Sequence, residues 1–282
     1  KARDVGYSHL LYDTERGATN RLLTNTTDGE ASQATALTSF NSNGFSLGAL
    51  NGVNNAAQTF ASWSFRKAEK FFDICTWTGN STNQQISHSL GSVPAVIISK
   101  RTNQTSNWAV YHSGINGGSN PEQYGLYLDL TIAQQDNNTL WNDTAPTSTH
   151  FTVGGPTSGS ASTNGNGDSY VGYVFASDAG GYGDDGSESI IKCGSYTGNS
   201  SADGPTVTLG FEPQWVLIKE ADAAGNSWSL YDMMRDGTMG SHLRPNDTAA
   251  EDTGTNEVLP QATGFKLNTS SGRVNRGSNY IY

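Results

Sequence analysis

An acidic, glycine-rich stretch near residue 185 has the residue types of a cation site. Asp184, Asp185 and Glu188 lie beside Gly183 and Gly186. Carboxylates on flexible, glycine-containing loops are ligands that Ca²⁺ prefers. The acids do not alternate along the chain as they do in an EF-hand loop, so we interpret the stretch as a solvated linker. Ca²⁺ binding by the three acids is kept as the alternative.

Enzymatic arrangements are not indicated. The 5 histidines are scattered, and none has a second histidine or a cysteine at metal-ligand spacing. No serine occupies the Gly-x-Ser-x-Gly turn of a hydrolase, and the acids that a glycosidase would need as a facing pair fall in separate loops. We therefore predict a non-enzymatic protein that uses no cofactor and has no dedicated metal site.

Aromatic residues give the strongest indication of binding. The chain has 6 Trp, 12 Tyr and 10 Phe. Tyr124, Trp141 and Tyr182 lie in loop-like sequence and have no counterpart elsewhere in the chain. An exposed ring at such a position is able to stack on a sugar face or against a neighbouring subunit. We predict these three residues as ligand contacts.

The remaining aromatic residues recur because a long segment of the chain is repeated. Gly79, Pro94 and Lys100 are each followed 119 positions later by the same residue type, at Gly198, Pro213 and Lys219. Lys1 matches Lys100, since Tyr12-Asp13 follows Lys1 at the spacing at which Tyr111-His112 follows Lys100. Trp108 and Trp228 occupy one recurring position, and Trp63 and Tyr173 another.

A second recurring block defines the units. The pattern Leu, two residues, Asn or Asp, one residue, Thr begins at Leu22, Leu126 and Leu243. Repeats of about 110 residues are near the usual size of a domain. The prediction is the C-terminal part of a first unit, a whole second unit, a Gly/Asp-rich linker and a third unit lacking its last residues: 1–68, 69–178, 179–189 and 190–282.

Period-two alternation predicts strands. In residues 61–65 and 171–175 every second residue is apolar, which suits a strand with one buried face, whereas residues 95–98 and 215–218 are unbroken apolar runs typical of central strands. The fold class is therefore predicted as all-β, with tandem β-sandwich domains of jelly-roll type. Short helical turns are expected only after the Leu/Asn/Thr blocks, near residues 131–135 and 248–252.

Composition limits the partners. The formal net charge is −10 with a sequence pI near 4.8, which disfavours nucleic-acid binding. No run reaches the about 18 consecutive apolar residues of a membrane helix, so no membrane insertion is expected. Cys75 and Cys193 fall in different units, and we predict no disulfide between them.

Taken together, the motifs resemble repeat-containing virion proteins of marine tailed bacteriophages. The resemblance rests on Tyr-Thr-Gly-Asn at 196–199, Ala-Asp-Gly-Pro at 202–205, the run at 210–219, and Trp228 with Tyr231-Asp232. Such proteins are described as tail-fibre or structural components. The resemblance implies a location on the virion surface and no transferable catalytic residues.

The expected function is accordingly a structural or adhesive component of a phage virion: a tail fibre, a spike or a head-surface appendage. Its expected partners are other virion proteins and a host surface glycan. A homo-oligomer, with a trimer as one option, is expected because the sheet edges of an incomplete first unit need covering. The alternative is a secreted carbohydrate-binding or adhesin module of a cell.

Overall fold

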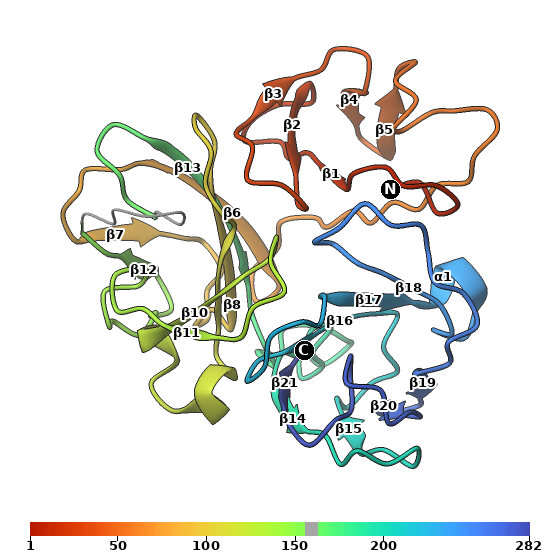
Figure 1. Ribbon diagram of the computed structural model, residues 1–282. Coiled ribbons are helices and arrows are strands. Elements are labelled where there is room, and N and C mark those ends of the chain that lie inside the picture. Colours follow the sequence, from red (N-terminus) through yellow and green to blue (C-terminus); the bar gives the residue numbers. More distant parts are fainter. Residues whose placement is uncertain (156–162) are drawn as a thin grey trace.

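Three lobes of antiparallel sheet surround a common centre in the structure, a computed structural model that describes residues 1–155 and 163–282 (Figure 1). We name them lobe 1 (residues 1–68), lobe 2 (69–178) and lobe 3 (190–282). Almost every regular element is a strand, so the all-β prediction is confirmed. Among the described residues, no helix has the length and apolarity needed to span a membrane.

Lobe 2 is a two-layer sandwich. Its larger sheet has the order β11-β10-β9-β8-β13-β6, and its smaller sheet pairs β12 with β7. Side chains from both sheets, such as Trp77 and Phe151, meet in one core. The strands are β6 (Phe72–Thr78), β7 (Gln84–Ser87), β8 (Val96–Arg101), β9 (Ala109–His112), β10 (Tyr124–Tyr127), β11 (Gln135–Asp136), β12 (His150–Val153) and β13 (Ser169–Phe175).

Lobe 3 also has two antiparallel sheets and a core of its own. One sheet has the order β14-β21-β16-β17-β18 and the other the order β15-β20-β19. The strands are β14 (Ser195–Thr197), β15 (Thr206–Thr208), β16 (Trp215–Glu220), β17 (Ser229–Asp232), β18 (His242–Leu243), β19 (Val258–Gln261), β20 (Gly264–Leu267) and β21 (Asn279–Ile281).

Lobe 1 also contains two antiparallel sheets, but they have fewer strands than those of lobes 2 and 3. Its sheets are β1 (Leu10–Leu11) with β2 (Asn20–Leu23) and β3 (Ala31–Ser32), and the hairpin of β4 (Leu37–Asn41) with β5 (Gly44–Leu47). Of its side chains, Leu22 is fully buried in a core that lies between the lobes, together with Trp108 and Trp228.

Two local predictions are wrong. Residues 61–65 form no strand, and only an isolated bridge, Ala2 to Phe60, marks the expected pairing. The helical turns lie not at 131–135 or 248–252 but at η1 (Ile115–Gly118), η2 (Pro121–Gln123) and α1 (Met233–Asp236). The predicted central strands are correct, because β8 and β16 each lie between two other strands.

One aromatic arrangement occurs in both complete sandwiches. Trp77 stacks on Tyr170 at 5.3 Å between ring centroids and 10° between planes, and Tyr196 stacks on Tyr280 at 5.1 Å and 9°. Each first ring also meets a phenylalanine of the opposite sheet edge-on. The first strand of a lobe therefore inserts an aromatic ring between the two sheets.

The same backbone hydrogen bond crosses all three boundaries between lobes. In each case the N–H of a residue that follows the Leu/Asn/Thr block donates to a carbonyl two positions after the recurring lysine of another lobe. The pairs are Glu30 to Thr102 at 2.6 Å, Gln134 to Ala221 at 2.7 Å, and Glu251 to Arg3 at 2.7 Å. Lobe 1 binds lobe 2, lobe 2 binds lobe 3, and lobe 3 returns to lobe 1.

Tryptophan side chains reinforce two of these boundaries. The indole N–H of Trp108 donates to the Leu23 carbonyl at 3.0 Å, and that of Trp228 donates to the Tyr127 carbonyl at 2.9 Å. At the third boundary the corresponding residue is His9, whose ring lies against the Arg244 carbonyl. The recurring Asn or Asp of the block holds each of these residues in place, because its side-chain oxygen accepts the backbone N–H. The pairs are His9 to Asn25, Trp108 to Asp129 and Trp228 to Asn246.

We predict that Trp108→Phe is more destabilising than Trp141→Phe by about 1–2 kcal/mol, measured by urea unfolding. Both tryptophans are buried, at 0% and 1% exposure, so both substitutions remove similar ring volume. Only the Trp108 indole donates to a carbonyl, since the Trp141 indole nitrogen has no hydrogen-bond partner among the described residues. Equal losses for the two variants would contradict a stabilising role for the hydrogen bond between lobes 1 and 2.

Candidate functional site

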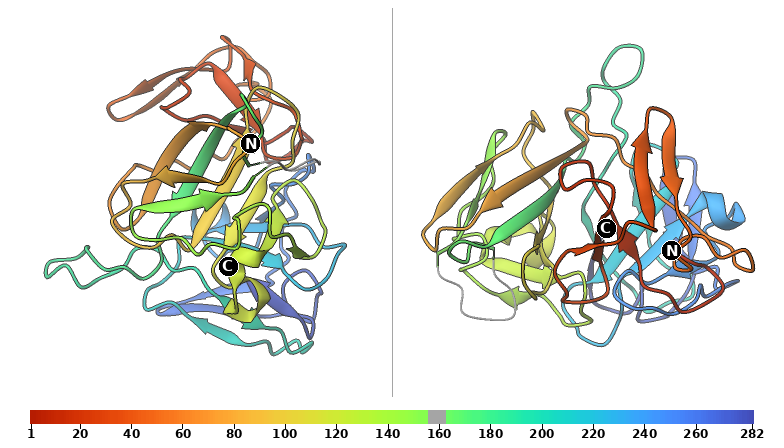
Figure 2. Two further views of the ribbon diagram at one scale, coloured as in Figure 1. Left: turned by 90° about the vertical axis from the view of Figure 1, so that its left-hand side faces the viewer. Right: turned by 90° about the horizontal axis from the view of Figure 1, so that it is seen from above.

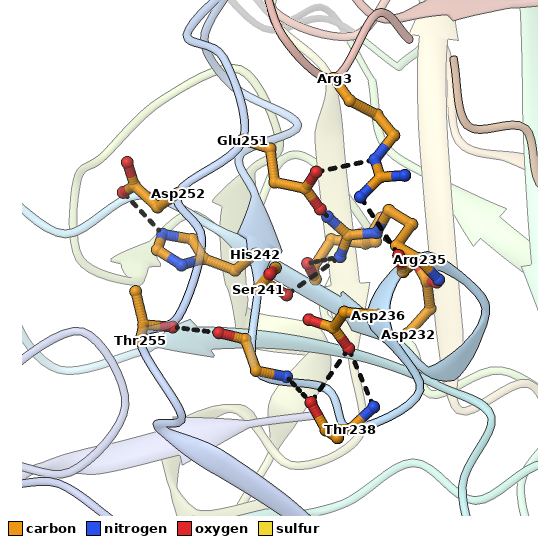
Figure 3. A network of polar contacts seen from close by, with 12 residues as sticks. Arg3, Asp232, Arg235, Asp236, Thr238, Ser241, His242, Glu251, Asp252 and Thr255 are labelled. Carbon is orange, nitrogen blue, oxygen red and sulfur yellow. Dashed lines mark hydrogen bonds and ion pairs between the residues drawn. The ribbon is translucent and has the colours of Figure 1, made fainter. Parts of the chain in front are cut away.

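The densest group of charged side chains lies where lobe 3 meets lobe 1 (Figure 3). Arg235 pairs with Asp232 and Glu251, and all three side chains are at most 3% exposed. Arg3 of lobe 1 completes the group through Glu251, with 2.7 Å between Nε and Oε2. The indole of Trp63, also from lobe 1, donates to the Asp232 carboxylate at 3.1 Å.

A matching cluster lies between lobes 1 and 2. The Arg16 Nε is 2.6 Å from Asp13 Oδ2, and its Nη1 is 3.0 Å from Glu30 Oε2. Tyr173 of lobe 2 donates to the same Asp13 oxygen at 2.6 Å, in the role that Trp63 has at Asp232. Two boundaries are thus fixed by an Asp, Arg and Glu cluster capped by an aromatic donor from another lobe.

The third boundary replaces every charge of this cluster. His112 stands in the aspartate position, Ile115 three residues later in the arginine position, and Gln134 in the glutamate position. The His112 ring contacts the Tyr282 carbonyl of lobe 3 at 3.0 Å, and the Gln134 side chain accepts the Asn116 N–H at 2.8 Å. Replacing all three charges together leaves no single buried ion without its partner.

Burial keeps three histidines neutral, His9 and His112 at lobe boundaries and His242 within lobe 3. It lowers the pKa of His9 to about 3, of His112 to about 4 and of His242 to about 3, and nearby Arg273 adds to the effect at His242. A general acid or base works best with a pKa near the working pH. These three residues therefore support packing rather than proton transfer.

Two recurring lysines are buried as well. Lys100 and Lys219 are both 0% exposed, and burial lowers the pKa of each to about 8. The Lys100 ammonium donates to the carbonyls of Thr27 and Ser106, at 2.9 Å and 2.6 Å. The Lys1 ammonium reaches the Thr248 carbonyl in the same way, at 3.1 Å. Lys100 and Lys1 thus bind backbone across a lobe boundary, whereas the Lys219 ammonium donates to the Glu220 carbonyl of its own strand at 2.7 Å.

The predicted ligand contacts do not form one site. Trp141 is 1% exposed and packs edge-on against Tyr111 in the core of lobe 2, so its prediction as an exposed stacking ring is wrong. Tyr124 begins β10 and packs partly against the core between the lobes. Tyr182 lies on the linker, and its hydroxyl donates to the Glu69 carbonyl at 2.9 Å. The three rings therefore lie in three separate places: the core of lobe 2, the edge of the core between the lobes, and the linker.

The acidic linker projects away from the lobes (Figure 2). Asp184, Asp185 and Glu188 are exposed, and Asp185 accepts hydrogen bonds from the N–H and hydroxyl of Ser187. Tyr182 pairs with Glu188 across the turn. Within residues 1–155 and 163–282, no group of three or more His, Cys, Asp or Glu could hold a metal ion. The three acids therefore do not assemble a Ca²⁺ site among these residues.

A shallow depression on lobe 2 is lined only by neutral polar residues. Its volume is about 490 Å³. The buried Gln84 side-chain oxygen has no hydrogen-bond partner among the described residues. Amide and hydroxyl groups of this kind recognise uncharged polar ligands through hydrogen bonds. The lining residues are Asn83, Gln84, Gln85, Asn142, Thr144 and Thr152.

Sequence reasoning missed both charged clusters, although a signal for them was present. Asp13 and Asp232 are each followed three positions later by an arginine, and the corresponding pair in lobe 2 is His112 and Ile115. The aspartate and the arginine are thus present together in lobes 1 and 3 and replaced together in lobe 2. Such joint replacement indicates that the two side chains form an ion pair. The depression left no such signal, because its residues come from separate segments.

Comparison with known proteins gives one family match. A family model described as "Domain of unknown function (DUF7483)" matches residues 1–282. No curated protein and no solved structure matches the chain.

We predict that Arg235→Ile destabilises the protein by about 3–5 kcal/mol, because the buried Asp232 carboxylate would lose its counter-ion and Glu251 would keep only Arg3. The triple variant Asp232→His, Arg235→Ile and Glu251→Gln should recover at least half of that loss, since it installs the neutral set of lobe 2. Chemical denaturation of the single and triple variants measures both values. A triple variant less stable than Arg235→Ile would show that the two sets are not interchangeable.

A second prediction concerns Asp129, which stands where lobes 1 and 3 have Asn25 and Asn246. Burial raises the pKa of Asp129 from 3.8 to about 6, against the opposing effects of the Trp108 N–H and Lys100. A raised carboxyl pKa means that stability is lost as pH rises from about 4 to 6. Asp129→Asn should therefore raise the free energy of unfolding by about 1–2 kcal/mol at pH 7.

The gain from Asp129→Asn should disappear below about pH 4, where aspartate is neutral in both states. Unfolding curves at pH 3.5, 5 and 7, values chosen to bracket the shift of about two units, measure this dependence. Asp143→Asn, at an exposed position of the same lobe, is the control. A gain independent of pH would contradict the assignment to the Asp129 charge.

Proposed function

Because the chain belongs to the DUF7483 family, whose description assigns no activity, we propose its role from its architecture and sequence motifs. The protein is a non-enzymatic structural or adhesive component of a phage virion, part of a tail fibre, spike or head-surface appendage. The observation that carries the proposal is the closed set of boundaries, with backbone hydrogen bonds of 2.6 to 2.7 Å at each one. Such boundaries suit a rigid unit that presents a surface.

The use of the ionisable groups supports a non-enzymatic role. Buried Asp232 and Glu251 are neutralised by Arg235 together with Arg3, and Asp13 is neutralised by Arg16 at the next boundary. Catalytic acids and bases instead face a cleft with a pKa suited to their task. These buried ion pairs join the lobes.

Adhesion to a host glycan is the second part of the proposal. The depression on lobe 2 offers amides at Gln84 and Asn142 and hydroxyls at Thr144 and Thr152, without any charge. These groups complement the hydroxyls of a neutral sugar. A secreted carbohydrate-binding module of a cell would use the same surface, so the depression supports that alternative as well.

A glycan array tests the adhesive part. We expect retention of a neutral oligosaccharide, reduced at least about tenfold in affinity by Gln84→Ala with Asn142→Ala, since each lost hydrogen bond costs about 1 kcal/mol. Gln261→Ala, which removes an exposed amide from lobe 3, is the matched control. Binding that is lost equally in the control, or a polysaccharide cleaved by the protein, would contradict the proposal.

The location is tested separately by immunogold labelling in negative-stain images of the source particles. Labels on the tails or heads of virions are the expected result. Labels on cell surfaces or only in the secreted fraction would instead favour the carbohydrate-binding module of a cell.

A further inference from the structure

We propose that the depression on lobe 2 binds one sugar residue of a neutral glycan against the main chain of Thr152, at a gap in the outer edge of β12. The inference rests on the proposed function and deepens it, because it assigns the sugar to main-chain groups as well as to the amide and hydroxyl side chains. Its basis is a comparison of the outer edge of β12 with the same edge of β20 in lobe 3.

The ladder between β12 and β7 shows where the main chain of Thr152 points. The His88 N–H donates to the Thr149 carbonyl at 2.9 Å, so these two opposite residues form a hydrogen-bonded pair. Hydrogen-bonded pairs alternate along an antiparallel ladder. Phe151 and Val153 therefore bond to β7, whereas the N–H and C=O of Thr152 point to the outer edge of β12.

In lobe 3 the corresponding edge is covered by β19, which pairs with β20 along its whole length. Lys266 is the counterpart of Thr152, since it follows Phe265 as Thr152 follows Phe151. Lys266 lies opposite Leu259 of β19. The main-chain groups at this position thus have partners within lobe 3.

In lobe 2 the same edge is paired on both sides of Thr152 but not at Thr152. The Thr147 N–H donates to the His150 carbonyl at 2.8 Å, and the Gly154 N–H donates to the Leu140 carbonyl at 3.2 Å. Among the described residues, no backbone or side-chain group bonds the outward N–H or C=O of Thr152. The edge of β12 therefore has a gap that is one residue long.

A left-handed turn accounts for the gap. Asn142 and Asp143 have φ of 55° and 44°, whereas at the corresponding place in lobe 3 only Asn256, with φ of 48°, is left-handed. The additional left-handed residue turns the chain away from the edge, and Asn142 and Thr144 line the depression instead. Left-handed residues other than glycine are unfavourable and cluster at ligand sites.

Thr152 forms the floor of the depression. Of the six described residues that line it, Thr152 is the one that is buried, with 6% of its surface exposed. Its N–H is a donor and its C=O is an acceptor, and both point to the same side. Because a hydroxyl group acts as donor or acceptor, two hydroxyls of one sugar ring are able to satisfy both groups.

The length of the gap favours a sugar over a peptide. A peptide that adds to a sheet edge uses several consecutive main-chain pairs, but Thr147 and Leu140 already fill the positions on both sides of the gap. The lining carries no charge, which favours a neutral glycan. In lobe 3 the Lys266 ammonium instead lies 2.5 Å from the Asp203 carboxylate, so that lobe offers neither the gap nor a neutral surface.

Amide hydrogen exchange, measured residue by residue by NMR on the whole chain, tests the proposal. The probes are maltotriose, cellotriose and chitotriose at about 10 mM, and a peptide of residues 256–261, the segment that covers this edge in lobe 3. We expect a sugar to slow exchange at the Thr152 amide, which gains an acceptor, and to leave the Lys266 amide unchanged.

The outcomes separate this inference from the adhesive function. Binding of a sugar without slower exchange at Thr152 would overturn the inference and leave the adhesive function standing. No binding of any sugar, here or on the glycan array, would overturn both. Slower exchange at Thr152 with the peptide but with no sugar would show that the gap takes a peptide.

Thr152→Pro and Thr152→Val separate the main chain from the side chain. Both remove the hydroxyl, but only proline removes the N–H, and no ladder bond is lost because this N–H points away from β7. We expect Thr152→Pro to bind the sugar at least about fivefold more weakly than Thr152→Val, which corresponds to about 1 kcal/mol. Equal affinities of two folded variants would contradict the proposal. The unfolding midpoint shows whether each variant is folded, and the exchange measurement needs neither of them.

Discussion

One backbone hydrogen bond, repeated at each boundary between lobes, is the constraint on which the rest of the structure depends. Its donor follows a turn that an Asn or Asp side chain fixes, and its acceptor lies two residues after the recurring lysine. Because the three bonds run in the same direction around the molecule, they close a ring. Side chains at the boundaries then have fixed neighbours, which is why ion pairs can be buried there without losing their partners.

Sequence patterns predicted the all-β class and the central strands correctly, but not the pairing of every strand. Apolar runs located β8 and β16 correctly, since a central strand is buried on both faces whatever surrounds it. The alternation at residues 61–65 predicted a strand that did not form, because pairing requires a neighbour on the edge and alternation reports only the faces. Trp141 was predicted as exposed, but its contact with Tyr111 depends on how a loop folds back onto the core.

The candidate sites also differ in whether the sequence alone could have indicated them. The Asp-x-x-Arg pairs could have been predicted from the sequence, because both residues lie in one turn and recur together. The amide-lined depression was not, since Gln84 and Asn142 approach only when separate segments pack. The neutral residues His112, Ile115 and Gln134 show that a boundary between lobes can form without buried charges.

Ring closure also bears on the order in which the chain folds. Most contacts of lobes 2 and 3 join strands within one lobe, whereas Arg3 and Glu251 meet across 248 positions. The entropy lost in closing a loop increases with its length, so distant pairings form late unless earlier structure brings them together. The last step of folding should therefore be the docking of residues 1–68 between two preformed sandwiches, and its rate should be the one most sensitive to the boundary between lobes 1 and 3.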